Sequence, residues 1–226
     1  MAEVDSFLAG DSVASRAFYW FVRNLLNIFC RTFWRTKVIG SKNIPVRGPF
    51  VLAPIHRSNI DTPLACTVTG RRMRYMGKDS LWKKRSVGWV LSALGGFPVS
   101  RGTADREALR RGIAVLEAGE PLVLFPEGER KSGPIVQPLF DGAMYIAVKA
   151  GVPVVPVGIG GSERAMPKGK KYLRPSKCVV IVGEPLIPPT SDGRAARSSV
   201  KEFTGRLHAE LQRLFDAAQE AAGVPQ

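Results

Sequence analysis

The sequence predicts a single α/β domain with a mixed, largely parallel central sheet flanked by helices, preceded by an amphipathic N-terminal helix. Two observations indicate this class. From residue 37 onward, short β-branched runs bounded by Gly and Pro alternate with stretches of helical periodicity, which is typical of α/β domains. A length of 226 residues with 45% hydrophobic residues suits one domain with a sizeable core and excludes an intrinsically disordered chain.

Residues 12–35 are predicted to form one long helix with a basic face and an apolar face. Arginines and asparagines fall in one sector, and bulky apolar side chains lie outside it: Phe18, Phe21, Val22, Leu25, Phe29 and Phe33. Trp20 and Trp34 lie among the arginines, which is typical of a helix in a membrane interface. We therefore expect residues 1–36 to be a membrane anchor and residues 37–226 a separate domain. The alternative is a helix packed on the domain's own core.

The rest of the chain is read from its periodicity. Strands are expected where β-branched runs are bounded by Gly or Pro: Lys37–Ile39, Pro49–Ala53, Arg74–Met76, Phe97–Val99, Leu122–Phe125, Pro153–Gly158 and Cys178–Gly183. Helices are expected between them, at Thr62–Thr69, Leu81–Leu94, Ala104–Ala118, Gly142–Ala150 and Arg194–Ala222. The last helix has an apolar stripe that includes Val200, Phe203, Leu207 and Leu211, which indicates a helix packed on the domain.

The composition restricts the classes of partner and site. With 33 Lys and Arg against 19 Asp and Glu, the net charge of +14 predicts an anionic partner. Three separated cysteines and two histidines predict neither a disulfide framework nor a zinc site, and they suit a reducing cytoplasm. Glu3 and Asp5 stand where a secretory signal carries basic residues, so export is not expected. No charge-free apolar run reaches the roughly 18 residues that span a bilayer.

A polar cluster follows the predicted strand 49–53, at a strand-to-helix turn. His56 and Asp61 stand five residues apart, just before Thr62-Pro63 begins a helix. On a continuous helix they would lie about 140° apart, so they meet only if the segment turns between them. A carboxylate bound to one imidazole nitrogen leaves the other free as a general base near neutral pH. This turn is therefore a candidate catalytic site.

Charged residues also follow the apolar strand 122–125. The turn carries Glu127, Gly128 and Arg130. Gly128 allows a close approach of the backbone to a ligand, and the guanidinium of Arg130 offers a planar fork for phosphate. In isolation, these residues fit an ordinary turn with a surface ion pair equally well.

HRSNID at residues 56–61 followed by FPEGER at 125–130 resembles the H-x-x-x-x-D and F-P-E-G-x-R blocks of the 1-acyl-sn-glycerol-3-phosphate acyltransferase family of glycerolipid acyltransferases. GGFPVSR at 95–101 is similar to the family's second block, and VVPV at 154–157 to its fourth. The blocks occur in the family's order over roughly residues 37–185, and their joint match is more specific than any one of them. The resemblance implies an O-acyltransferase domain at 37–226.

Carried over residue by residue, the resemblance implies that His56 is the general base and that Asp61 orients it. It also implies an acceptor-phosphate site at Arg101, Glu127, Gly128 and Arg130, and an acyl-donor region shaped by Pro156. The chain departs from the family pattern at Ile55, Glu129 and Lys131. A carboxylate at residue 129 repels a nearby phosphate unless Arg130 and Lys131 offset it, so the departure bears on the acceptor and leaves the catalytic pair intact.

The expected reaction follows from that resemblance. A fatty acyl group passes from a thioester of coenzyme A or acyl carrier protein to the sn-2 hydroxyl of 1-acylglycerol 3-phosphate and gives phosphatidic acid. No metal and no further cofactor is expected. Glycerol 3-phosphate or another lysophospholipid is the alternative acceptor. An acyl-enzyme on Ser58 or Cys66 is the competing chemistry, although the chain has no G-x-S-x-G elbow.

Two basic clusters remain. Residues 71–85 hold seven basic side chains against Asp79 alone, and residues 164–177 hold six with no acid. The first is expected to face an anionic bilayer, which predicts a peripheral or monotopic protein at the cytoplasmic face of the cell membrane. The second fits a bilayer, a solvated face, an acidic acyl carrier protein or the phosphates of coenzyme A.

Two other functions compete with catalysis. A nucleic-acid-binding module would use Tyr75 and Trp82 as stacking residues, but the chain carries no recognisable nucleic-acid motif, so no nucleic-acid partner is expected. A non-catalytic lipid-binding scaffold is the other alternative, and the presence of His56, Asp61, Glu127 and Arg130 speaks against it.

Overall fold

The computed structural model describes residues 12–99, 106–170, 172–189 and 197–224. The described chain forms a seven-stranded sheet in the order β1-β7-β6-β2-β5-β3-β4, and each neighbouring pair is parallel except β6 with β7. The strands are β1 (Lys37–Ile39), β2 (Val51–Pro54), β3 (Arg74–Lys78), β4 (Gly96–Val99), β5 (Leu122–Val123), β6 (Val154–Gly160) and β7 (Val179–Val182). The predicted α/β class with a largely parallel sheet is confirmed, and every predicted strand is present.

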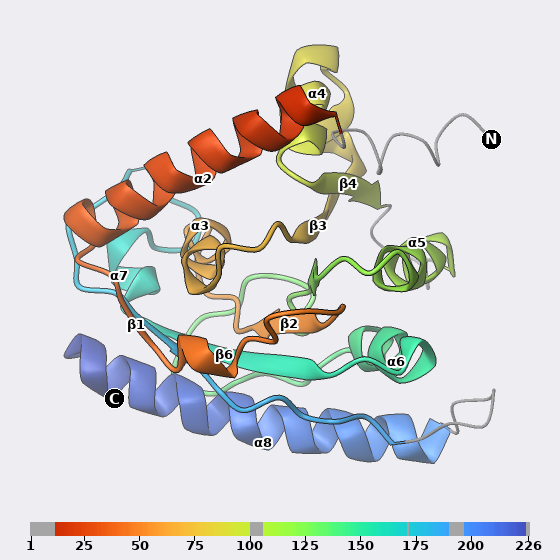
Figure 1. Ribbon diagram of the computed structural model, residues 1–226. Helices are drawn as coiled ribbons and strands as arrows, with labels where there is room; N and C mark the ends of the chain where they lie inside the picture. The colour runs from red at the N-terminus through yellow and green to blue at the C-terminus, as the bar shows by residue number, and fades with distance from the viewer. Residues whose placement is uncertain (1–11, 100–105, 171, 190–196, 225–226) are drawn as a thin grey trace.

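The helices cover this sheet, with α2 and α8 on opposite sides of the strands (Figure 1). The α-helices are α2 (Val13–Phe33), α3 (Asp61–Ala65), α4 (Arg85–Ala93), α5 (Arg106–Glu117), α6 (Asp141–Ala150), α7 (Ser162–Ala165) and α8 (Arg197–Ala222). Short 3₁₀ turns are η1 (Ser41–Asn43), η2 (Cys66–Val68) and η3 (Asp79–Trp82). The helix predicted at 62–69 is split into α3 and η2, and α7 was not predicted because a single turn leaves no periodic pattern.

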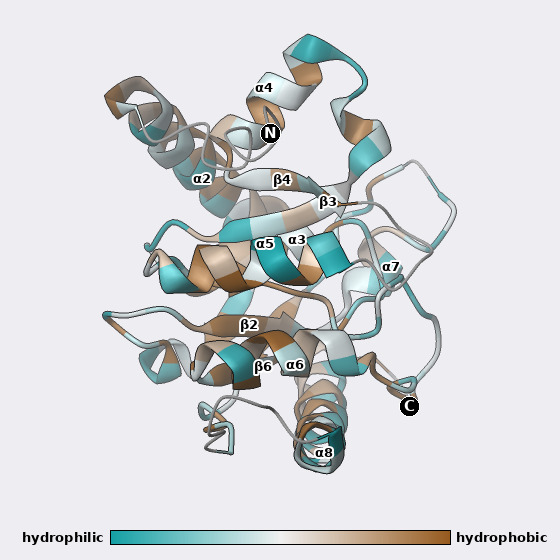
Figure 2. Cartoon of the chain, turned by 90° about the vertical axis from the view of Figure 1, so that its right-hand side faces the viewer, coloured by the Kyte–Doolittle hydropathy of each residue, from teal (hydrophilic) through white to brown (hydrophobic). Residues whose placement is uncertain are grey.

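The core is centred on β2 and β6. Every residue of both strands is buried. Parallel strands that are covered on both faces are continuously apolar rather than alternating, and this is why VLAP and VVPVGIG could be recognised as strands. Figure 2 shows the same strands as apolar bands inside the molecule.

Helix α2 packs against α3, η2 and α4 while much of its apolar surface faces outward. Tyr19 and Cys30 are buried, and Arg23 donates hydrogen bonds to the backbone oxygen of Thr69. The exposed apolar side chains of the helix are Val13, Trp20, Phe21, Leu25, Ile28 and Phe29. Among the described residues, no helix has both the length and the apolar character needed to cross a bilayer.

Candidate active site

His56 and Asp61 meet at the end of β2, as the sequence predicts. Oδ2 of Asp61 accepts hydrogen bonds from the backbone N–H groups of Arg57 and Ser58, both at 2.6 Å. The segment therefore turns back on itself, and Nδ1 of His56 lies 3.1 Å from the same carboxylate oxygen. Asp61 is fully buried, whereas 14% of the His56 side chain is exposed. When Nδ1–H donates to Asp61, Nε2 is left as the proton acceptor.

The end of β5 completes the support of His56. The imidazole stacks on Phe125 with ring centroids 4.1 Å apart, and the backbone N–H of His56 donates to Oε2 of Glu127 at 2.9 Å. Strands β2 and β5 are parallel neighbours, so their carboxyl ends reach the same edge of the sheet. The two motifs, 70 residues apart at Arg57 and Glu127, are brought together by this pairing.

Glu127 is buried, and its carboxylate accepts hydrogen bonds from other groups of the protein. It forms an ion pair with Arg57, with Nη1 at 2.7 Å from Oε1 and 2.8 Å from Oε2, and accepts from the backbone N–H of Gln137. Glu127 does not line the cavity that contains His56. The predicted contact of Glu127 with the acceptor phosphate stays a prediction; the contacts that the structure gives this residue are those of a positioning residue.

The other predicted binding residues occupy different places. Arg130 lines the His56 cavity. Gly128 has φ +70°, a backbone conformation that favours glycine, and an added Cβ would lie 2.6 Å from a ring carbon of Phe140, so any other residue would strain the turn. Pro156 is buried in β6, paired in register with Ala53, and does not line the cavity. Arg101 lies outside the described residues.

The His56 cavity has a volume of about 460 Å³, within the range of small-molecule sites. Its wall combines apolar side chains with charged ones from two loops, Glu129 and Arg130 after β5 and Lys168 after α7. Glu129, at which the chain departs from the family pattern, therefore lines the site. Its carboxylate forms an ion pair with Lys131, whose Nζ lies 2.7 Å from Oε1 of Glu129. The ion pair reduces the repulsion that this carboxylate exerts on a phosphate.

A second cavity of about 320 Å³ adjoins the first and is almost wholly apolar. Four residues line both cavities: Thr62, Tyr75, Leu91 and Gly96. Helix α2 contributes Tyr19, Val22 and Leu26 to its wall. The N-terminal helix is therefore part of the site and not only an appendage to it, a role that no sequence pattern indicated.

Ser58 and Cys66, the two candidate nucleophiles of an acyl-enzyme route, both form hydrogen bonds with other groups of the protein. Oγ of Ser58 donates to the backbone oxygen of Met166 at 2.6 Å, and Ser58 is fully buried. Sγ of Cys66 lies 2.9 Å from Oη of Tyr75, and burial raises the pKa of the Cys66 thiol above its ordinary value. A thiol that stays protonated is a poor nucleophile. The geometry favours direct transfer over an acyl-enzyme.

Sequence reasoning missed Arg57, Phe125 and Lys168. Arg57 is 1% exposed, and its guanidinium carbon lies 4.9 Å from the ring centroid of Phe215. Lys and Arg are rarely buried without a partner, but the partner of Arg57 lies 70 residues away at Glu127, so no local pattern indicated the pair. Among the described residues, no group of three His, Cys, Asp or Glu side chains is placed to hold a metal ion.

Comparison with known proteins identifies the family of the chain. Residues 35–160 match the acyltransferase family. The chain is 30% identical to the 1-acyl-sn-glycerol-3-phosphate acyltransferase of Bacillus subtilis, covering 74% of this chain and 82% of that one. It is 29% identical to the chloroplastic 1-acyl-sn-glycerol-3-phosphate acyltransferase BAT2 of Brassica napus, of whose length it spans about half, 53%.

A solved structure is similar over almost the whole chain. The crystal structure of the 1-acyl-sn-glycerophosphate (LPA) acyltransferase PlsC from Thermotoga maritima superposes with a TM-score of 0.73 at 28% identity, covering 94% of this chain and 86% of that one. The family match includes both the His56 turn and the Glu127 turn. The chain therefore belongs to the acyltransferase family, among the 1-acyl-sn-glycerol-3-phosphate O-acyltransferases.

Proposed function

We propose that the protein transfers a fatty acyl group from a thioester donor to the sn-2 hydroxyl of 1-acylglycerol 3-phosphate and so forms phosphatidic acid. The observation that carries the proposal is that His56, paired with the buried Asp61, lines a cavity that Arg130 also lines and that adjoins an apolar cavity. The cation suits a phosphate, and the apolar cavity suits a hydrocarbon chain.

In the proposed mechanism, Nε2 of His56 removes the proton of the acceptor hydroxyl as its oxygen attacks the thioester carbonyl. The tetrahedral intermediate then expels the thiolate, which takes up the proton held by His56. Asp61 holds the imidazole in one orientation and stabilises the imidazolium while it carries the proton. Each step uses groups of this chain, and His56 ends the cycle neutral.

The test is thiol release from oleoyl-coenzyme A with 1-acylglycerol 3-phosphate in anionic mixed micelles, with the lipid product identified. His56→Ala and Asp61→Asn should each lose activity on the order of 10²- to 10⁴-fold. His208→Ala is the matched control, because His208 lies on α8 and binds the backbone oxygen of Val136. Recovery of acylated protein after incubation with donor alone would contradict the direct mechanism.

The acceptor is tested in the same assay. Glycerol 3-phosphate and other lysophospholipids are the alternative acceptors, and comparison of their kcat/KM values with that of 1-acylglycerol 3-phosphate ranks them. Inactivity of the folded wild-type protein with all acceptors and both classes of thioester would contradict the proposal.

We further propose that the protein is held peripherally at the cytoplasmic face of the cell membrane by α2 and α4. Helix α2 exposes large apolar side chains, and its half-buried Phe18 lies against the exposed Trp89 of α4, with ring centroids 5.8 Å apart. Lys83, Lys84 and Arg85 are exposed at the start of α4, where they could bind anionic headgroups. Arg74 of the same predicted cluster is buried and paired with Glu120, so that part of the cluster does not face a bilayer.

The alternative of a nucleic-acid-binding module has no support from the positions of its candidate stacking residues. Tyr75 lines both cavities, and Trp82 packs against Gly77 while its indole N–H donates to Oγ of Ser92 at 3.0 Å. Aromatic side chains that bind bases need an exposed face.

A further inference from the structure

We propose that the segment formed by residues 164–170, together with Arg174, binds the phosphates of coenzyme A, so that the nucleotide end of the donor lies across Lys168 and in the cavity between α7 and α8. The inference rests on the proposed function, because it names the carrier of the thioester. It also assigns a role to the second basic cluster, for which the sequence left several partners open.

This segment is attached directly to the catalytic turn. Ser58, two residues from His56, donates its hydroxyl hydrogen bond to the backbone oxygen of Met166. Two residues further on, Lys168 lines the His56 cavity. A donor whose thioester lies at His56 therefore meets the Lys168 ammonium as it leaves the cavity on this side.

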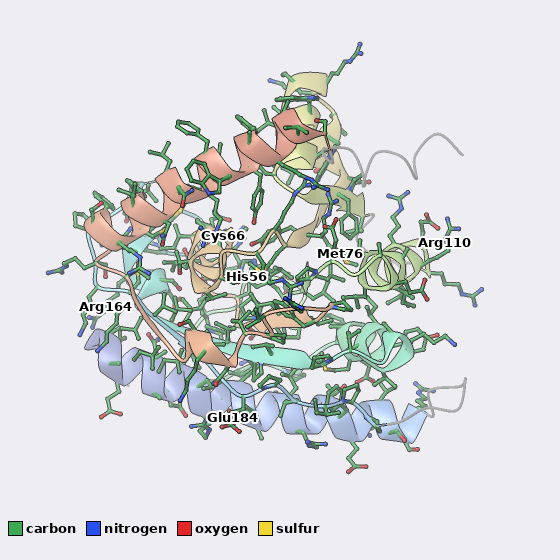
Figure 3. The ribbon with its side chains drawn as sticks, viewed as in Figure 1. His56, Cys66, Met76, Arg110, Arg164 and Glu184 are labelled. Atoms are coloured by element: carbon green, nitrogen blue, oxygen red, sulfur yellow. The ribbon has the colours of Figure 1, made fainter. Side chains whose placement is uncertain are left out.

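A larger cavity, of about 610 Å³, lies on the other side of the same segment. Pro167 lines this cavity, whereas its neighbour Lys168 lines the His56 cavity, so the two sites adjoin across one peptide. Arg164 and Arg174 contribute the cationic side chains of its wall, which also includes Gln219 of α8. Figure 3 shows Arg164 at the edge of the molecule that carries α7, with His56 further inside.

The described partners of both arginines are neutral. Nη1 of Arg164 donates to the backbone oxygen of Gly223, and Nη2 of Arg174 donates to Oη of Tyr172. Glu163 is the acidic residue in the cavity wall. Two guanidiniums against one carboxylate leave a positive site, and guanidiniums bind phosphate in a bidentate fashion.

This arrangement fits coenzyme A better than acyl carrier protein. Coenzyme A carries its thioester on an uncharged arm, followed by a diphosphate and then a nucleotide with a further phosphate. It therefore requires cations for the diphosphate at the far end of that arm, where the donor leaves the His56 cavity, and beyond them a second cavity with cations for the nucleotide phosphate. A carrier protein presents one phosphate and an acidic surface, which would not fill a cavity. Helix α8 lies on the side of the sheet opposite α2, so the nucleotide would remain in water while the lipid approaches from the α2 side (Figure 1).

The experiment is a calorimetric titration of free coenzyme A into the full chain, which needs neither an acceptor nor turnover. Arg174→Glu and Lys168→Glu should each weaken binding about tenfold, the loss expected for one charge-assisted hydrogen bond. Lys201→Glu is the matched control, because Lys201 is an exposed lysine on α8 that lines neither cavity. Far-ultraviolet circular dichroism checks that each variant is folded.

A second test varies the ligand rather than the protein. Wild-type protein should bind 3′-dephospho-coenzyme A more weakly than coenzyme A, and Arg174→Glu should narrow that difference. In the acylation assay, Arg174→Glu should raise KM for oleoyl-coenzyme A and leave KM for the lysophospholipid unchanged.

Several results would overturn the assignment. Equal affinity of wild type and Arg174→Glu for coenzyme A would do so, as would a preference for an acyl carrier protein thioester in the acylation assay. Coenzyme A binding that responds to these substitutions in a protein inactive with every acceptor would instead contradict the proposed function and leave the donor site standing.

Discussion

The buried ion pair of Arg57 and Glu127 connects the two motifs of the candidate active site. Glu127 holds both the guanidinium of Arg57 and the backbone N–H of His56, and neither charged side chain reaches solvent. A charge pair that is removed from water depends on both partners, because each alone would be an uncompensated buried charge. The pair therefore positions His56 through the hydrogen bond from its backbone N–H to Glu127, and it does so from outside the cavity that His56 lines.

At this scale we predict that Glu127→Gln lowers the free energy of unfolding by about 3 kcal/mol, since it leaves the Arg57 charge without its partner. Urea unfolding followed by circular dichroism measures the change. Glu129→Gln is the control, because the Glu129 side chain is 65% exposed and its ion pair is worth little. Equal stability of Glu127→Gln and wild type would show that the pair does not support the turn.

Among the elements, α2 is unusual because it uses both of its faces. Its inner side packs on α3 and α4 and lines the apolar cavity, while its outer side exposes large apolar residues. Exposed apolar side chains gathered on one helix indicate an interaction surface. For a helix with arginines near its boundary, that partner is expected to be a lipid surface.

We predict that Leu25→Glu with Ile28→Glu lowers partitioning into anionic liposomes at least tenfold, because each change removes an apolar side chain worth about 1.5–3 kcal/mol when buried. Flotation measures the partitioning. Val46→Glu is the matched control, since Val46 is 85% exposed and lies outside α2. Unchanged flotation of the double variant would exclude this face as the membrane contact.

The packing of α8 on β6 depends on glycine. A Cβ added to Gly158 or Gly160 would collide with the backbone of α8 at Leu214 or Ala218, so the absence of side chains on β6 allows the helix to approach closely. Gly205, within α8 itself, has no atom near its missing Cβ. Substitution by alanine should therefore destabilise the protein at Gly158 or Gly160 and stabilise it at Gly205.

We predict that Gly160→Ala lowers the free energy of unfolding by about 1–3 kcal/mol through overpacking. Gly205→Ala should raise it by about 0.5–1 kcal/mol, because alanine is the better helix former. Urea unfolding of both variants measures whether the free energy of unfolding falls for Gly160→Ala and rises for Gly205→Ala. A stabilised Gly160→Ala protein would contradict the close approach of α8.

Across the whole molecule, buried thiols and phenols are expected to make the free energy of unfolding fall as the pH rises into the alkaline range. Burial raises the pKa of Cys30 and of Cys178 from 9.0 to about 12, and that of Tyr19 from 10.0 to about 12. The fold favours the neutral form of each group. Their contribution is complete below pH 9, where the groups are protonated in both states. It is lost between about pH 9 and pH 12, where the unfolded chain releases protons that the folded chain retains.

We predict that the free energy of unfolding is constant from neutral pH to about pH 9 and then falls by about 1.4 kcal/mol per pH unit for each such thiol. Urea unfolding at a series of pH values measures the decline. Cys178→Ala should make it shallower, since one titrating group is removed. A flat profile to about pH 11 would show that these thiols ionise equally in the folded and unfolded states.

How much could be predicted from the sequence differs between the fold and the site. Strands β2 and β6 were predicted because burial on both faces requires apolar residues throughout, and the stripe of α8 because one helical face must be apolar. The predicted membrane anchor and the domain division at residue 36 remain predictions, and the structure adds that Cys30 and Trp34 are part of the core. Helix α7 is too short to leave a periodic signal.

The sequence by itself determined the fold class, the pairing of His56 with Asp61 and the family, because each is encoded locally, in periodicity or in a motif a few residues long. Only the tertiary structure decided that Glu127 binds Arg57 and His56, that α2 lines the apolar cavity, and that Lys168 lines the His56 cavity. These contacts join residues far apart in the chain. They depend on which strands are neighbours in the sheet, and a pairing of distant strands leaves no mark in the local pattern of either one.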